Sequence, residues 1–133
     1  MAKLTNEGEN NVLNTYLKGV ARGDLYLALY TDASEPAEAI TLATITELPE
    51  GVNGYDRIAL DDGDWTVVND VATNVQKTFT AAGGDWGNVY GYFICNVITG
   101  VVGKVLFVES FSDGPYNVLN GLSVLVTPAI QAA

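Results

Sequence analysis

The chain has 133 residues, of which 16 are acidic, 6 are basic and none is histidine, giving a formal net charge of −10. A chain of this length suits one domain whose core is large enough to fold without disulfides or metal. The excess of acidic residues argues against binding to a nucleic-acid backbone or to an anionic membrane, because both kinds of binding need lysine and arginine.

The cellular compartment can be inferred from the cysteine content and from the first residues. Cys95 is the only cysteine, so an intramolecular disulfide is impossible, and we expect a buried, inert thiol. No run approaches the roughly 18 consecutive apolar residues of a membrane-spanning helix. The opening residues MAKLTNE lack the apolar core of a signal peptide. We therefore expect the chain to be made and to fold in a reducing cytoplasm.

The N-terminal segment, residues 1–22, carries the clearest helical pattern. Thr5 or Asn6 can cap a helix start, and Gly19 can end the helix. Acidic residues in the first turn and Lys18 in the last turn match the helix dipole. We expect a short helix that packs across one sheet or against a neighbouring subunit. Its apolar side chains fall on one stripe, formed by Val12, Leu13, Tyr16, Leu17 and Val20.

Short strands separated by turns are predicted for residues 24–127, which we expect to form a sandwich. The clearest early strand covers residues 24–31, where leucines alternate with other side chains. An acidic loop follows, and then a weaker strand at residues 40–46. The residues from 128 to 133 are predicted to be a small mobile tail. Further strands are predicted at residues 55–60, 65–69, 71–79 and 122–127.

The stretch from Asp85 to Phe107 is predicted to be the centre of the fold. It contains two runs rich in β-branched and aromatic residues, separated by a short segment of Asn, Thr and Gly. Such runs predict adjacent antiparallel strands, and their nearly continuous apolar character predicts burial on both faces. The sequence therefore predicts an all-β, single-domain β-sandwich of about eight strands with one short N-terminal helix.

Residues that carry enzyme chemistry are scarce. Without histidine, the commonest general base and metal ligand is missing, and no Ser-His-Asp or Cys-His arrangement can form. The acidic turn at residues 61–64 lacks the residue order of a calcium loop, so a solvated turn is favoured over a weak cation site. We therefore predict no enzyme activity, no cofactor and no bound metal.

Aromatic residues are the main candidates for an interaction surface. Trp86 follows Asp85, and this pair could form a platform for a sugar; a turn whose Trp side chain folds over the sandwich edge is the favoured alternative. Tyrosine rings suit both interfaces and cores, so both roles stay open for each of them. The candidate interaction residues are Val12, Tyr16, Tyr26, Tyr30, Trp86, Tyr90 and Tyr92.

The order of the sequence segments resembles a family of small tailed-bacteriophage virion proteins, described as tail-fibre-like, cement or decoration proteins. The resemblance covers most of the chain. It rests on the N-terminal helix, LYLALYT at 25–31, GYDR at 54–57, DWGNVYGYFICN at 85–96, KVLFVE at 104–109 and NGLSVLVT at 120–127.

This resemblance implies a jelly-roll-like sandwich on the capsid surface of the virion, synthesised in the cytoplasm of the bacterial host. It implies a protein that cements or decorates neighbouring major-capsid subunits, with the major capsid protein as partner and a homo-oligomer, a trimer or a dimer, as the unit. The alternative is a tail, collar or fibre component, or a carbohydrate-binding module with Trp86 as the platform. Copy number separates these possibilities, because a lattice-wide protein is far more abundant than a fibre.

Overall fold

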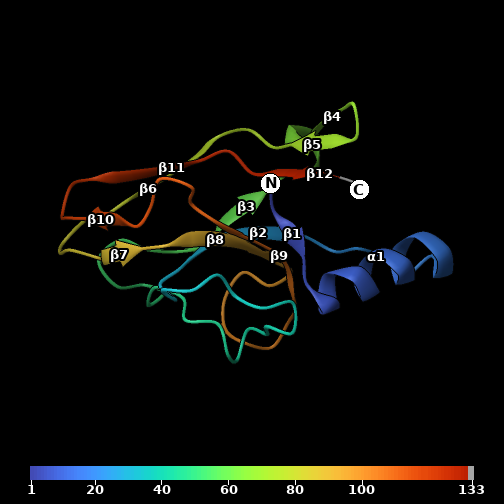
Figure 1. Ribbon diagram of the computed structural model, residues 1–133, viewed down its shortest axis with the longest axis horizontal. Coiled ribbons are helices and arrows are strands. Elements are labelled where there is room, and N and C mark those ends of the chain that lie inside the picture. Colours follow the sequence, from blue (N-terminus) through green and yellow to red (C-terminus); the bar gives the residue numbers. More distant parts are fainter. Residues whose placement is uncertain (132–133) are drawn as a thin grey trace.

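A five-stranded antiparallel sheet forms the centre of the computed structural model, which describes residues 1–131 (Figure 1). The predicted pairing of β8 with β9 is confirmed, with Phe93 opposite Val108, and all five side chains of β8 are buried. In spatial order the strands are β1 (Lys3–Leu4), β9 (Val105–Ser110), β8 (Gly91–Cys95), β2 (Leu25–Tyr30) and β3 (Ile58–Leu60).

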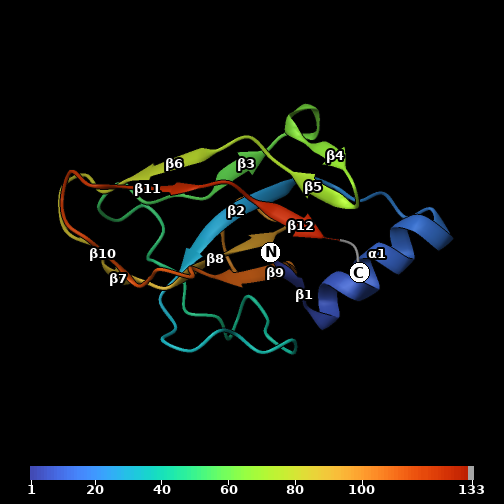
Figure 2. The same cartoon turned by 45° about the horizontal axis from the view of Figure 1, so that its top comes forward.

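A second layer lies over one face of this sheet and is built from three smaller antiparallel ladders (Figure 2). Along the sequence, β5 to β8 pair in reverse order with β12 to β9, so residues 71–131 form one long two-stranded ribbon folded across both layers. The ladders pair β7 (Gly87–Val89) with β10 (Tyr116–Val118), β6 (Lys77–Thr80) with β11 (Ser123–Val126), and β5 (Val71–Thr73) with both β4 (Thr66–Val68) and β12 (Ala129–Gln131).

Two apolar clusters cover the two faces of the central sheet. Between the layers, Leu27 and Ile94 of the sheet pack in one cluster with Phe79 of β6. On the opposite face, Leu42 and Ile45 from the long segment before β3 pack against the sheet. The central strand β8 is therefore buried from both sides, as its continuous apolar sequence predicts.

A buried ion pair holds this long segment in place. The guanidinium of Arg57, whose side chain is 1% exposed, donates hydrogen bonds to both carboxylate oxygens of Glu47, at 2.9 and 2.7 Å. It also donates to the carbonyl oxygens of Val97 and Gly100, each at 2.9 Å. Arg57 thus ties the segment that covers the sheet to the loop between β8 and β9.

The all-β prediction is confirmed, but several boundaries differ. Residues 1–131 contain twelve strands, more than the predicted eight. Many of the twelve are only two or three residues long, which is too short for an alternating pattern to identify them in the sequence. The strand predicted at 40–46 is wrong: Thr41 accepts hydrogen bonds that close turns there. The strand predicted at 71–79 is split at Asn74. Residues 129–131 of the predicted tail form β12, and residues 132–133 lie outside the described part.

Replacing Arg57 with Met is expected to lower the free energy of unfolding by about 3–5 kcal/mol, because Glu47 would keep a nearly buried charge without its partner. Denaturant unfolding measures this loss. Lys3→Met is the matched control, since Lys3 and Glu35 form an ion pair whose side chains are 41% and 44% exposed and should contribute less than about 1 kcal/mol. Equal losses in the two variants would contradict the role of Arg57.

The thiol of Cys95 is expected to be inert in the folded chain. Burial raises its pKa to about 11, against the opposing effect of the Arg57 charge, so almost no thiolate exists at pH 8. A thiol reagent at pH 8 should label the native protein orders of magnitude more slowly than the denatured protein. Rapid labelling of the native state at the rate of a free thiol would contradict this expectation.

Candidate interaction surface

The helix α1 (Asn6–Lys18) has the ends that the sequence predicts. The Thr5 hydroxyl accepts a hydrogen bond from the Gly8 N–H at 3.0 Å, and so it caps the first turn. At the other end Gly19 adopts φ 70°, a left-handed conformation that favours glycine, and its N–H donates to the Asn14 carbonyl. Two acidic residues lie in the first turn and Lys18 lies in the last, in accord with the helix dipole.

The first turn of α1 is anchored on β9. Gly8 is buried there, and a Cβ atom at this position would overlap the Leu106 carbonyl oxygen. The Glu7 carboxylate accepts a hydrogen bond from the Val105 N–H at 2.9 Å, and its other oxygen lies 3.2 Å from Lys104 Nζ. The buried Thr5 hydroxyl donates to the Val105 carbonyl. These contacts fix both the position and the direction of the helix.

Beyond this turn, α1 leaves the sandwich and projects from one end of the molecule (Figure 1). The prediction that the helix packs across a sheet is therefore wrong for the single chain; packing against a neighbouring subunit stays a prediction. The apolar stripe is left open to solvent, with Val12 47%, Leu13 55%, Tyr16 86%, Leu17 72% and Val20 53% exposed.

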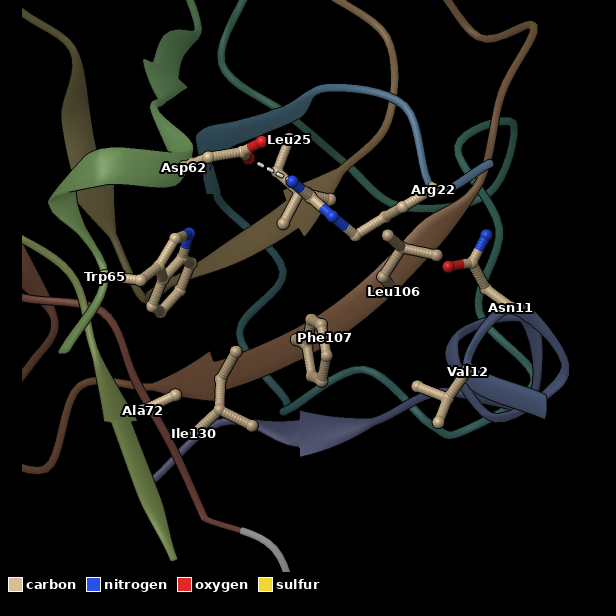
Figure 3. Close-up of a pocket in the computed structure, with 10 residues that line it drawn as sticks. All are labelled: Asn11, Val12, Arg22, Leu25, Asp62, Trp65, Ala72, Leu106, Phe107 and Ile130. Atoms are coloured by element: carbon tan, nitrogen blue, oxygen red, sulfur yellow. Dashed lines mark hydrogen bonds and ion pairs between the residues drawn. The ribbon is translucent and has the colours of Figure 1, made fainter. Parts of the chain in front are cut away.

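An open apolar groove of about 380 Å³ lies between α1 and the sandwich (Figure 3). Val12 forms part of its wall on the helix side, and the ion pair of Arg22 with Asp62 lies at its rim. These two charged side chains neutralise each other. The remaining apolar lining comes from both layers of the sandwich and consists of Leu25, Trp65, Ala72, Leu106, Phe107 and Ile130.

The tyrosine candidates of the sheet do not share this surface. Tyr30 and Tyr92 are buried; the Tyr30 hydroxyl lies 2.9 Å from Ser110 Oγ, and the Tyr92 hydroxyl donates to the Glu109 carboxylate. Tyr26 and Tyr90 are half-buried against the cluster that contains Leu42 and Ile45, on the face of the sheet opposite the second layer. Of the seven candidate residues, Val12 and Tyr16 are the two that the structure places together on α1.

Trp86 is part of a turn packed on the sandwich edge. Its Nε1–H donates to the Asn53 carbonyl at 2.8 Å, and its ring meets Tyr55 edge-on, with the ring centres 5.8 Å apart. The neighbouring Asp85 carboxylate accepts a hydrogen bond from the Asn120 N–H at 2.7 Å. The Trp86 N–H and one oxygen of the Asp85 carboxylate are thus engaged within the fold, in keeping with the turn interpretation.

Some surface residues are missing from the sequence-based candidates. Leu13, Leu17 and Val20 belong to the same stripe as Val12 and Tyr16, so helical periodicity alone identifies them. The groove carries no such local signal, because its lining residues lie far apart in the sequence.

The structure also bears on other kinds of site. Within residues 1–131, no three Asp, Glu or Cys side chains gather in an arrangement that could hold a metal ion. Among the same residues, no helix combines the length and the apolar character that crossing a membrane requires.

Gly8→Ala tests the anchoring of α1. Alanine favours helix by up to about 1 kcal/mol over glycine, so a free helix would gain stability. Here the new methyl group overlaps the Leu106 carbonyl, and we expect a loss of roughly 1–3 kcal/mol in the free energy of unfolding, measured with urea. The control Asn10→Ala, at an exposed position of the same helix, should be neutral or stabilising. Stabilisation by Gly8→Ala would contradict the anchor.

Comparison with known proteins identifies the family to which the chain belongs. The family described as "Podophage GP4 fiber I protein gp80" matches residues 3–127, which include α1 and nearly all of both layers. No curated protein matches the chain at a significant level. Because the match spans far more than half of the sequence, the chain belongs to the Podophage GP4 fiber I protein gp80 family and is a tailed-phage virion protein of the fibre type.

Proposed function

We propose that this chain is a non-enzymatic structural subunit of a fibre on the tail of a phage particle. The observation that carries this proposal is the exposed apolar surface of α1 and its groove, which is suited to contact with another protein. The family description supports a fibre as the structure that contains it.

The chemistry of the groove supports a structural role. Apart from Asn11, its polar lining is limited to Arg22 and Asp62, which are paired with each other. General acid–base or nucleophilic catalysis needs a reactive group poised beside a bound substrate, with a shifted pKa or a neighbouring base. The groove instead has an apolar wall with an ion pair at its rim, and such a surface can bind another protein through hydrophobic contact.

The architecture supports the same role. The central strand is covered on both faces, and Arg57 fastens the covering segment with four hydrogen bonds. Such a domain resists local opening, because exposing β8 means breaking a buried ion pair as well as apolar contacts. A fibre subunit works outside the cell, so resistance to local opening suits this role, and the single cysteine cannot add an intramolecular disulfide.

The family description favours the tail or fibre alternative over the capsid-cement hypothesis that the sequence suggested first. A capsid cement protein covers the shell in numbers comparable with the major capsid protein, whereas a fibre protein is present in few copies at one site. The two hypotheses therefore differ in both location and amount.

Immunogold labelling of purified virions, together with mass-spectrometric quantification, tests the proposal. We expect gold particles at the fibres of the tail and a copy number that is a small fraction of that of the major capsid protein. An antibody against the major capsid protein is the control and should label the shell. Label spread over the shell with near-equal copy number would contradict the proposal and restore the capsid-cement hypothesis.

A further inference from the structure

The exposed part of α1 is too short to be stable by itself. Isolated helices below about 12–15 residues are marginal in water, and α1 has 13 residues, three of them Asn after the turn that Gly8 anchors. Most helices in proteins gain stability by burying an apolar face. In the single chain this face contacts solvent from Val12 to Val20, so the helix is expected to be covered in its functional state.

The uncovered area is large enough for a specific interface. The five side chains of the stripe expose on the order of 600 Å², the upper end of the apolar patches that monomeric proteins show. The adjoining groove adds Trp65, Phe107 and Ile130. Stripe and groove together approach the roughly 800 Å² that each partner contributes to a standard protein interface.

The distribution of charge permits a second copy of this acidic chain at this surface. Residues 1–22 contain three basic and two acidic residues, whereas residues 23–133 contain three basic and fourteen acidic ones. The net charges of the two parts are therefore +1 and −11. Because α1 projects from the body, the stripe lies in the part of the chain that lacks the acidic excess, so a second copy can approach it with little charge repulsion.

The surface combines an exposed ridge with a hollow, a shape that can pair with its own copy. Val12 belongs to both the stripe and the groove wall, so a ridge and a hollow form one continuous patch. A two-fold axis pairs such a patch with its own copy, the ridge of each chain facing the hollow of the other. In an antiparallel helix pair, Lys18 points toward the acidic first turn of the other helix, which favours both charges and dipoles.

Unpaired polar groups occur at the same end of the molecule. Within residues 1–131, the Thr15 hydroxyl and the Nη1 atom of Arg22 are buried without a hydrogen-bond partner. Lys18 is the one basic residue that forms no ion pair with another described residue. The two buried atoms are enclosed within the single chain, whereas Lys18 is exposed, so Lys18 is the group that can gain a carboxylate partner from a second chain.

We propose that two copies of this chain associate about a two-fold axis through antiparallel α1 helices, each stripe packing against the stripe and the groove of the other copy. This inference does not depend on where the protein sits in the virion.

Light scattering coupled to size-exclusion chromatography, over a range of concentrations, tests the proposal on the full chain. We expect a mass of twice the 14.1 kDa chain. Leu17→Glu should weaken association on the order of 100-fold or more, because it places a charge in the apolar seam. Leu125→Glu is the matched control, an exposed leucine on β11, a strand of the second layer that does not contact α1, and should leave the mass unchanged.

A cross-linking experiment locates the contact. Tyr16 lies at the middle of the stripe, so Tyr16→Cys places a thiol where the two antiparallel helices would be closest, and mild oxidation should give a covalent dimer. Under the same treatment Leu125→Cys should stay monomeric on denaturing electrophoresis. Buried Cys95 contributes no background. A monomer at all concentrations, a trimer or larger species, equal effects of the two Glu variants, or no cross-link through Cys at position 16 would each overturn the proposal.

Discussion

The need to cover β8 on both faces shapes the whole molecule. All five of its residues are buried, so a sheet with one solvent-facing side could not accommodate it. One face of β8 is covered by the folded ribbon, because its β5–β12 and β6–β11 ladders pack over the central sheet. The segment before β3 covers the other face, although it has little regular structure of its own. Most of the chain is thus committed to enclosing one central strand.

The second cover requires an anchor, because a long segment without strands loses much entropy when it is ordered and gains few backbone hydrogen bonds in return. Arg57 provides it at the junction of this segment with β3. Its carboxylate partner Glu47 also accepts a hydrogen bond from the Tyr55 hydroxyl, which itself accepts from the Leu29 N–H of the sheet. The buried charge of Glu47 is thus compensated by Arg57 and by a hydrogen bond from Tyr55. This network links the covering segment, the central sheet and the loop between β8 and β9.

Features that are local in sequence could be predicted, and features that depend on distant partners could not. The helix carries its caps, charges and stripe within twenty residues, and β2, β8 and β9 are long apolar runs. The three-residue strand β12 has no such pattern; it exists because Thr73 and its neighbours on β5 offer a ladder. The groove likewise brings together Leu25, Trp65 and Ile130, which no spacing rule relates. The sequence could show that the stripe exists. Its exposure depends on the direction of the helix, which the contact of Gly8 with the backbone of β9 sets.

The contact at Gly8 has a mechanical consequence. The contacts of α1 with β9 lie in its first turn, and residues 19–24 lead back to β2, so the helix is an arm about 20 Å long between two attachments. A tilt of about 10° at the first turn would displace the C-terminal end of the helix by roughly 3 Å, and residues 19–24 would have to absorb this movement. Two chains paired through their helices could therefore change their mutual angle slightly while each sandwich keeps its structure. Any flexibility of such a pair would then reside in the first turn of α1 and in residues 19–24, outside the two apolar clusters that keep each chain folded.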